Sequence, residues 1–377
     1  MRLLVAGGGT GGHLFPGIAV ADEVLRRGGS EVLFVGTSRG IEARAVPAAG
    51  YALETLQVSG LKRMGLGATM RGLFRVPLAI LRSRTILRKF RPDVVLGVGG
   101  YASGPMVLAA ALLGYPTAIQ EQNSVPGITN RVLGRLVRAV FIAFEDAARF
   151  FPARKIERLG NPVRQKIVAA LESAQPTAPS ASLRILVVGG SQGARAVTDL
   201  VMATAQVLAA RQFDFTLLHQ TGTADLARVE ARYCELGLSD RAQAKAFIDD
   251  MASAYANADV VVARAGALTL AELAIAGKPA ILIPLPTAAD DHQRKNAARF
   301  ASEGAAQLFD QATARAEDLA ATIVELGNNP SKRAQMSTAM RALARPQAAQ
   351  AVADRLLELA SNSGRTTIHS ARGSRAA

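Results

Sequence analysis

Short apolar runs alternate along the chain with amphipathic stretches, a pattern that predicts strands followed by helices. The first run, residues 2–6, is bounded by glycines, as buried strands commonly are, and residues 18–27 have the spacing of a helix with one apolar face. Further runs predict strands over residues 31–36, 93–98, 117–120, 183–188, 215–220, 244–247, 260–263 and 280–283. Strands that alternate with helices pair in parallel through right-handed crossovers, so the pattern predicts a doubly wound α/β fold.

The two halves of the chain open on the same arrangement of a strand, a glycine-rich turn and a helix. The turns are Gly7-Gly8-Gly9-Thr10-Gly11-Gly12-His13 and Gly189-Gly190-Ser191-Gln192-Gly193. Such a turn leaves unpaired backbone N–H groups aimed at one spot, which suits a phosphate. We therefore expect two similar α/β domains that face each other across a cleft. The first comprises residues 1–162 and a C-terminal helix over 347–360, the second comprises 163–345, and a disordered tail follows over 361–377.

Composition places the chain among globular proteins of a reducing compartment. The 377 residues are 49% hydrophobic, and the single cysteine, Cys234, excludes an internal disulfide framework and a cysteine metal cluster. Residues 94–120 carry no charge, but glycines and prolines cut them into a strand, a turn, a helix and a strand, all too short to span a bilayer. Because the chain opens directly on a strand, we expect no secretory signal.

The positive charge is concentrated in the N-terminal half. Residues 1–165 hold 22 Lys and Arg against 10 Asp and Glu, which accounts for +12 of the net charge of +14. This half therefore faces an acidic partner, which could be nucleic acid, an anionic membrane or a phosphorylated substrate. Nucleic acid is the weakest of the three, because the chain has no tryptophan and too few aromatic residues for base stacking.

Residues 61–91 combine a strong positive charge with interleaved apolar side chains. They hold no acidic residue and nine basic ones, which are Lys62, Arg63, Arg71, Arg75, Arg82, Arg84, Arg88, Lys89 and Arg91. A cationic amphipathic stretch of this kind suits an anionic lipid surface. The alternatives are an ordinary solvated helix with its apolar side on the core, or a surface for a partner protein.

The first glycine-rich turn also fits the dinucleotide-binding pattern G-x-G-x-x-G through Gly7, Gly9 and Gly12. That pattern needs an acidic residue at the end of the second strand, to hold a ribose diol. Here the strand ends in Val35-Gly36-Thr37, without an acid. A nicotinamide or flavin enzyme is therefore the second choice.

A stronger nucleotide signal follows the strand over 260–263. The helix should begin near Ala267, so its free N–H groups and positive dipole end could receive a diphosphate. Glu272 lies about one turn inside this helix, on the same face as Thr269, and its carboxylate could accept both hydroxyls of a ribose. The alternative is that Glu272 only completes a capping box.

Three polar groups could carry the chemistry. His13 follows two glycines at a helix start and could take a proton from an attacking hydroxyl, or could only bind a phosphate or cap the helix. The strand ends at Glu121-Gln122-Asn123 and Gly99-Gly100-Tyr101 should meet His13 at one sheet edge. Residues 290–297 could read sugar hydroxyls or form a solvated helix start. No cluster has metal-ligand spacing and no Asp-x-Asp occurs, so we expect no obligatory metal.

Together these motifs closely resemble one family over residues 1–360, in order and at similar spacing. The chain resembles the MurG family of bacterial glycosyltransferases, which convert lipid I to lipid II in peptidoglycan synthesis. The motifs that carry the resemblance are Gly7-Gly8-Gly9-Thr10-Gly11-Gly12-His13-Leu14-Phe15-Pro16-Gly17, Gly99-Gly100-Tyr101-Ala102-Ser103-Gly104-Pro105, Glu121-Gln122-Asn123, Gly160-Asn161-Pro162-Val163-Arg164, Gly189-Gly190-Ser191-Gln192-Gly193-Ala194, Phe247-Ile248-Asp249-Asp250-Met251 and Arg264-Ala265-Gly266-Ala267-Leu268-Thr269.

The resemblance implies a GT-B fold and a division of labour between the halves. UDP-N-acetylglucosamine would bind the C-terminal domain, where Glu272 holds the ribose and the Ile248 backbone reads the uracil. The other implied donor residues are Ser191, Leu268 and Thr269 at the diphosphate with Arg164 nearby, and His292 and Gln293 at the sugar. The implied acceptor residues are Thr10, Gly11, Gly12, His13, Tyr101, Glu121 and Asn123, of which His13, Glu121 and Asn123 are the catalytic candidates.

The resemblance also implies the partners and the reaction. Lipid I is the acceptor, no cofactor is needed, and other cell-wall synthesis proteins are possible partners. Residues 61–91 would dock on the cytoplasmic face of the inner membrane as a peripheral attachment. The 4-hydroxyl of the acceptor would attack the anomeric carbon of the donor sugar and expel UDP with inversion. The leaving group would be stabilised by backbone N–H groups and a helix N-terminus.

Overall fold

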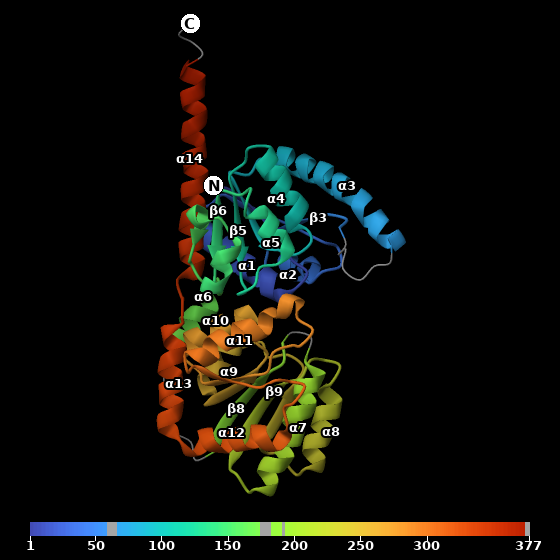
Figure 1. Cartoon of the computed structure of the whole chain (residues 1–377), viewed down its shortest axis with the longest axis vertical. Coiled ribbons are helices and arrows are strands. Elements are labelled where there is room, and N and C mark those ends of the chain that lie inside the picture. The colour runs from blue at the N-terminus through green and yellow to red at the C-terminus, as the bar shows by residue number, and fades with distance from the viewer. Residues whose placement is uncertain (59–65, 174–181, 191–192, 374–377) are drawn as a thin grey trace. The chain divides into compact units, whose positions relative to one another are not determined.

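The computed structural model describes residues 1–58, 66–173, 182–190 and 193–373 and divides the chain into two compact units. The first unit comprises Met1–Gln165 and Pro346–Ala377, and the second comprises Lys166–Arg345. Each unit is built on one parallel sheet with helices between the strands (Figure 1). The α/β class and the two parallel-sheet domains expected from the sequence are therefore confirmed.

The first unit holds a seven-stranded sheet in the order β3-β2-β1-β4-β5-β6-β7. Its strands are β1 (Arg2–Gly7), β2 (Glu31–Gly36), β3 (Ala52–Thr55), β4 (Val94–Gly99), β5 (Thr117–Glu121), β6 (Ala139–Ile142) and β7 (Ile156–Glu157). β1 pairs with both β2 and β4, so the strand order reverses at β1. In doubly wound sheets, ligands bind at the carboxyl ends of the strands beside this reversal.

Helices cover both faces of the first sheet, which explains why β1 is apolar and buried from Leu3 to Ala6. The helices are α1 (Gly11–Arg26), α2 (Glu42–Ala48), α3 (Leu66–Phe90), α4 (Ser103–Leu112), α5 (Ile128–Leu133) and α14 (Ala348–Gly373), with short turns η1 (Glu145–Phe150) and η2 (Ala153–Lys155). Leu4 packs with α3, α4 and α5 on one face, whereas Leu3 and Val5 pack with α1 and α14 on the other. A strand buried on both faces reads as a continuous apolar run.

α1 begins at Gly11, seven residues earlier than the sequence pattern predicts. The added segment contains Gly11, Gly12, Pro16 and Gly17, and glycine weakens helices. Gly17 is required by packing, since a Cβ at this position would lie 3.0 Å from a methyl group of Val5. Close approach of α1 to β1 thus explains the glycine inside the helix. The amphipathic pattern missed the first turns of α1, whereas the helix start expected at His13 lies two residues from the observed one.

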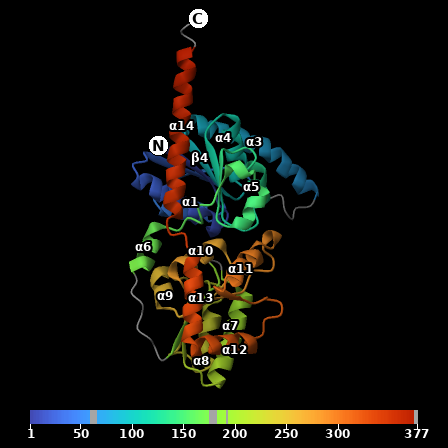
Figure 2. The same cartoon turned by 60° about the vertical axis from the view of Figure 1, so that its left-hand side comes forward.

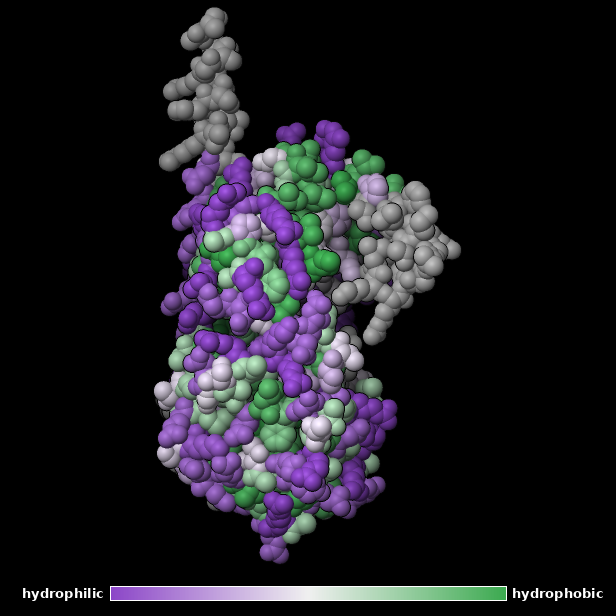
Figure 3. Space-filling view, in the orientation of Figure 1, coloured by the Kyte–Doolittle hydropathy of each residue, from purple (hydrophilic) through white to green (hydrophobic). Residues whose placement is uncertain are grey.

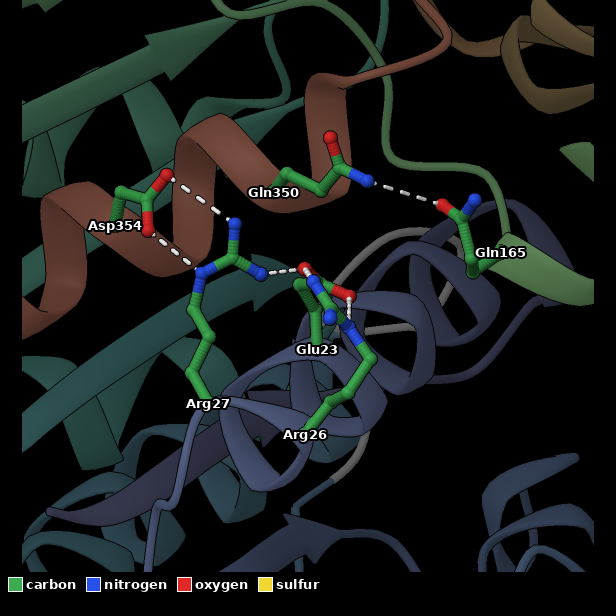
Figure 4. A network of polar contacts seen from close by, with 6 residues as sticks. All are labelled: Glu23, Arg26, Arg27, Gln165, Gln350 and Asp354. Atoms are coloured by element: carbon green, nitrogen blue, oxygen red, sulfur yellow. Dashed lines mark hydrogen bonds and ion pairs between the residues drawn. The ribbon is translucent and has the colours of Figure 1, made fainter.

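α14 returns from the end of the chain to the first unit and packs along α1 (Figure 2). Val352, Ala353 and Leu356 are buried in the same core as the apolar face of α1. Figure 4 shows the polar side of this contact, where Arg27 forms ion pairs with both Glu23 of α1 and Asp354 of α14. The helix continues to Gly373, although a tail without regular structure was expected from residue 361.

The second unit opens on the short helix α6 (Gln165–Ser173) and holds a six-stranded sheet in the order β10-β9-β8-β11-β12-β13. Its strands are β8 (Leu183–Val188), β9 (Phe215–Gln220), β10 (Ala242–Lys245), β11 (Val260–Ala263), β12 (Ala280–Leu282) and β13 (Ala306–Leu308). Its helices are α7 (Arg195–Ala210), α8 (Leu226–Glu235), α9 (Met251–Asn257), α10 (Ala267–Ala276), η3 (Ala289–Asp291), α11 (His292–Ser302), α12 (Ala316–Asn328) and α13 (Pro330–Ala342).

The uncharged stretch over residues 94–120 forms β4, α4 and β5, as the sequence predicts. In the part of the chain that the structure describes, no helix is long and apolar enough to cross a membrane. The loop expected around residues 173–180 lies almost wholly outside the described residues.

Candidate functional site

In the first unit, the predicted phosphate-binding turn lies at the reversal of strand order. β1 ends at Gly7, and α1 begins at Gly11 with Thr10 as its N-cap. The Gly8 N–H donates to the Gly99 carbonyl (3.2 Å), which joins this turn to the loop after β4. Among the described residues, the N–H groups of Thr10, Gly11 and Gly12 find no acceptor in the protein. Together with the dipole of α1, they can receive an anion.

His13 lies between the two loops that meet at this turn. Its Nδ1 atom is 3.3 Å from the Thr10 hydroxyl, which fixes the orientation of the ring. A Cβ at Gly99, the last residue of β4, would lie 3.0 Å from the ring, and Gly99 has a φ of +94°, so the strand must end in a glycine here. The half-buried imidazole therefore sits at the carboxyl edge of the sheet, beside the unpaired N–H groups.

Glu121 and Asn123 follow β5 at the same edge. The Glu121 carboxylate is 2% exposed and accepts hydrogen bonds from the Asn123 N–H (3.0 Å) and the Asn130 side chain (2.9 Å). Burial raises the pKa of Glu121 to about 6, against these hydrogen bonds. A carboxylate enclosed in this way orients Asn123 rather than facing solvent. Sequence reasoning missed Asn130, which stands on α5 without a motif.

Two further residues predicted to bind substrate, one on the acceptor side and one near the donor, lie in the first unit and are exposed. Tyr101 lies in the turn between β4 and α4, and its side chain is open to solvent. Arg164, predicted near the donor diphosphate, belongs to the first unit, where its guanidinium stacks 5.3 Å from the centroid of the Phe15 ring. Their roles stay predictions.

In the second unit, β11 leads into α10 as the sequence predicts. Gly266 is the N-cap of α10, so Leu268 and Thr269 contribute N–H groups to its first turn. Glu272 is half-buried and accepts a hydrogen bond from the Tyr255 hydroxyl (3.0 Å). The capping-box alternative for Glu272 requires Thr269 to be the N-cap of the helix, with Glu272 three residues later. It is wrong, because the N-cap of α10 is Gly266.

Tyr255 was not anticipated from the sequence, because nothing distinguishes it from an ordinary core aromatic on α9. Its side chain is fully buried, and burial together with the Glu272 charge raises its pKa well above the ordinary value. The phenol therefore stays a hydrogen-bond donor and holds the carboxylate in place.

Gln220, at the end of β9, joins two segments of the expected donor site. Its side chain donates to the Gly190 carbonyl (3.2 Å) and accepts from the Ile248 N–H (3.3 Å). Because the Ile248 N–H is occupied, uracil recognition by this residue would use its carbonyl. The signal for Gln220 was available in the sequence, since it is a polar residue that ends a buried strand.

Two predicted sugar-binding residues begin α11, directly after the loop that follows β12. The Gln293 side chain accepts from the Leu285 N–H (3.0 Å), and the His292 Nδ1 is 2.7 Å from the Ala289 carbonyl. The buried Arg264 donates to the carbonyls of Ile283 and Pro284 at the start of the loop. Both predicted residues thus contact the loop that precedes α11.

Other predictions fall outside these contacts. Ser191, expected at the donor diphosphate, lies outside the described residues. In the described ranges, no three His, Cys, Asp or Glu side chains are placed to hold a metal ion.

A groove of about 1050 Å³ opens beside β8, β9, β10 and α9, and it is lined in part by Phe247, Ile248 and Asp249 from the segment after β10. Most of its lining lies away from the carboxyl ends of β8 and β9.

Two families of known domains match the chain. Residues 3–142 match the glycosyltransferase family 28 N-terminal domain, and residues 184–352 match the glycosyltransferase family 28 C-terminal domain.

Curated relatives match over nearly the whole chain. A protein of Myxococcus xanthus is 49% identical over 95% of this chain and 93% of its own length, and one of Geobacter sp. is 47% identical over 93% and 94%. Both are named UDP-N-acetylglucosamine--N-acetylmuramyl-(pentapeptide) pyrophosphoryl-undecaprenol N-acetylglucosamine transferase.

Solved structures agree with this match. Acinetobacter baumannii MurG is 32% identical, with a TM-score of 0.76 over 95% of this chain and 99% of its own. The calicheamicin glycosyltransferase (16% identical, TM-score 0.69, 95% and 98% covered) and a UDP-GlcNAc 2-epimerase of Neisseria meningitidis (15%, 0.65, 95% and 100%) share the fold. The expected GT-B fold is thus confirmed. Since an epimerase also has it, the fold alone does not define the reaction.

Proposed function

The chain belongs to glycosyltransferase family 28, and we infer that it transfers N-acetylglucosamine from UDP-N-acetylglucosamine to lipid I. Lipid I is the N-acetylmuramyl-(pentapeptide) pyrophosphoryl-undecaprenol in the name of its relatives, and the product is lipid II. The identity of 49% to one of these transferases carries the conclusion, because the match covers 95% of this chain and therefore extends over both units.

The donor half of the proposed site is the carboxyl edge of the second sheet. Glu272, oriented by Tyr255, would accept the two ribose hydroxyls. The N–H groups of Leu268 and Thr269 at the start of α10 would bind the diphosphate, where negative charge grows as UDP leaves. The Ile248 carbonyl would read the uracil, while His292 and Gln293 face the sugar.

The acceptor half is the carboxyl edge of the first sheet. The N–H groups of Thr10, Gly11 and Gly12 would bind the diphosphate of lipid I at the positive end of α1. Tyr101 and Asn123 would contact the N-acetylmuramyl unit, with Asn123 held by Glu121.

The transfer is proposed as a single inverting displacement. The 4-hydroxyl oxygen of the acceptor bonds to the anomeric carbon as the bond to the β-phosphate oxygen breaks. His13 takes the hydroxyl proton, and UDP leaves with the bonding electron pair.

His13→Ala is expected to lower kcat by about a hundredfold, the usual contribution of a positioned base. The measurement is lipid II formation at saturating UDP-N-acetylglucosamine and lipid I. His13→Gln is the matched variant, because its amide can bind a phosphate but cannot accept the proton. Full activity of His13→Gln would assign His13 to phosphate binding and remove it from the base role.

The overall reaction is tested with purified protein, lipid I and labelled donor, by following lipid II. UDP-N-acetylgalactosamine and UDP-glucose serve as competitors, because the sugar pocket decides between them. Transfer from either competitor at the rate of UDP-N-acetylglucosamine would contradict the proposed donor.

We further propose that residues 61–91 dock on the cytoplasmic face of the inner membrane. Side chains are described from Pro77 onward, and in this part Leu78 and Leu81 are 65% and 58% exposed. Arg82, Arg84, Arg88 and Lys89 on the same helix are also exposed. Figure 3 shows apolar side chains gathered over the neighbouring α4 and α5. Exposed leucines among arginines favour contact with anionic lipid.

A further inference from the structure

A buried carboxylate lies beneath the first glycine-rich turn. Glu42 is the first residue of α2 and is 1% exposed. Its Oε2 accepts from the Gly9 N–H (2.7 Å), and its Oε1 accepts from the Thr37 N–H (2.8 Å) and the Thr37 hydroxyl (2.7 Å). All three partners donate, as an ionised carboxylate requires. Burial alone would raise the pKa of Glu42, but these hydrogen bonds hold it below its usual value.

Three glycines in two segments leave room for this side chain. A Cβ at Gly8, Gly36 or Gly40 would lie 2.5, 2.5 and 2.1 Å from atoms of Glu42. Gly8 also has a φ of +141°, which other residues rarely adopt. The turn after β1 and the end of β2 therefore close on the carboxylate, and a side chain on any of the three would displace it.

The hydrogen bond from Gly9 decides which N–H groups an anion can reach. Because the Gly9 N–H is occupied by Glu42, the next three N–H groups, from Thr10 to Gly12, are the ones left at the start of α1. The negative charge of Glu42 also repels an anion from the inner side of the turn. An incoming phosphate is thereby directed outward, to the helix end beside His13.

We propose that Glu42 is a positioning residue of the acceptor site. It fixes the turn over Gly7 to Gly9, so that the N–H groups of Thr10 to Gly12 and the ring of His13 face the acceptor diphosphate. The proposal rests on the acceptor site proposed above. Glu42 does not touch substrate, and it does not hold a ribose as the acid of a dinucleotide site would, because its oxygens are occupied by Gly9 and Thr37.

Glu42→Gln tests the proposal with little change in shape. The two backbone N–H groups meet different oxygens, so the amide nitrogen must face one of them and break that bond. We expect kcat/KM for lipid I to fall about tenfold, the effect of losing one hydrogen bond to a charged group. KM for UDP-N-acetylglucosamine should stay unchanged, because its proposed residues lie in the second unit.

Matched variants separate this role from a general loss of stability. Thr37→Val removes one of the three bonds and should lower kcat/KM for lipid I by less than Glu42→Gln does. Thr37→Ser keeps the hydroxyl and should leave kcat/KM for lipid I at the wild-type value. Glu31→Gln, an exposed glutamate at the other end of β2, should leave it at the wild-type value. Equal losses for donor and acceptor in Glu42→Gln would overturn the proposal.

Hydrogen exchange gives a readout besides activity. In Glu42→Gln the peptide covering residues 7–13 should exchange faster, with the rest of the first unit unchanged. Wild-type exchange and wild-type acceptor kinetics would overturn the proposal. Tyr101→Ala distinguishes the two possible failures, because it removes an exposed side chain proposed to contact the acceptor. If Tyr101→Ala raises KM for lipid I and Glu42→Gln does not, only the role of Glu42 fails; if neither does, the acceptor site itself is misplaced.

Discussion

Carboxylates in the proposed sites are each held by a partner distant in sequence. Glu272 is bound by Tyr255 of the preceding helix, and Glu121 by Asn130. Glu42 receives the N–H of Gly9, 33 residues away. Such partners fix the orientation of a charged group before substrate arrives, which lowers the cost of binding. The proposed sites are therefore organised in the absence of ligand.

Glu272→Ala is expected to weaken UDP-N-acetylglucosamine binding about tenfold or more, because bonds from two hydroxyls to a carboxylate are lost. Tyr255→Phe should weaken it less, since only the orienting hydroxyl disappears. Calorimetric titration measures both. The 2′-deoxyribose analogue of the donor is the control, and it should bind wild type more weakly but Glu272→Ala with little further loss. An unchanged affinity in Glu272→Ala would contradict the ribose assignment.

The sequence identified site residues that belong to glycine-rich turns and strand ends, and it missed those that reach the site through the fold. Thr10 and His13 stand in a recognisable turn. Glu42 does not, because it lies beyond the end of β2, and the five residues between Gly36 and Glu42 let its side chain return to the first turn. The contact of Glu42 with Gly9 depends on the pairing of β1 with β2, which no local pattern contains.

Among the elements, the central strands were predicted better than the helix boundaries, whereas β3, β6, β7 and β13 were not predicted. β9 and β11 match the predicted ranges, and β10 begins two residues earlier than predicted. Strands buried on both faces produce an unmistakable apolar run. By contrast, α1 begins at Gly11 and α14 continues to Gly373, whereas the amphipathic pattern predicts helices over residues 18–27 and 347–360.

α14 is secured to α1 by an apolar face and by one ion-pair network. Glu23 is buried and pairs with Arg26 and Arg27, and Arg27 also reaches Asp354 (Figure 4). Ion pairs that are shielded from water contribute far more when one partner is removed than exposed pairs do.

Glu23→Ala should destabilise the first unit by about 2 kcal/mol, because Arg27 then loses its buried partner. Arg26→Ala is the matched control, since the Arg26 side chain is 60% exposed and its loss should cost below about 1 kcal/mol. Urea unfolding followed by circular dichroism measures both. Equal urea midpoints for Glu23→Ala and Arg26→Ala would show that burial of Glu23 does not increase the contribution of the ion pairs to stability.

For the whole molecule, the asymmetry of charge matches the proposed division of substrates. The half with a net charge of +12 is the one proposed to meet a lipid-linked diphosphate at an anionic surface. The other half, close to neutral, is proposed to bind a nucleotide sugar through backbone groups and one carboxylate. Composition thus indicated an acidic partner, while the identity of that partner needed the motifs.

Replacing Leu78 and Leu81 by aspartate should lower binding to vesicles of anionic phospholipid about tenfold or more, because each buried leucine contributes at least about 1.5 kcal/mol. Vesicle sedimentation measures the binding, and added salt should weaken the wild-type interaction by screening the arginines. Leu308→Asp, an exposed leucine of the second unit, is the control. Unchanged binding of the double variant would place the membrane contact elsewhere.

The first unit is assembled from both ends of the chain, whereas the second is one continuous segment. On the ribosome, the second unit is complete before the codons for α14 are read, so it can fold early. The first unit must wait with the apolar face of α1 uncovered until Val352, Ala353 and Leu356 emerge. Premature termination near Arg345 would therefore leave a folded nucleotide-sugar half joined to an aggregation-prone remainder, and chaperone demand during synthesis should come from the older, N-terminal part of the nascent polypeptide.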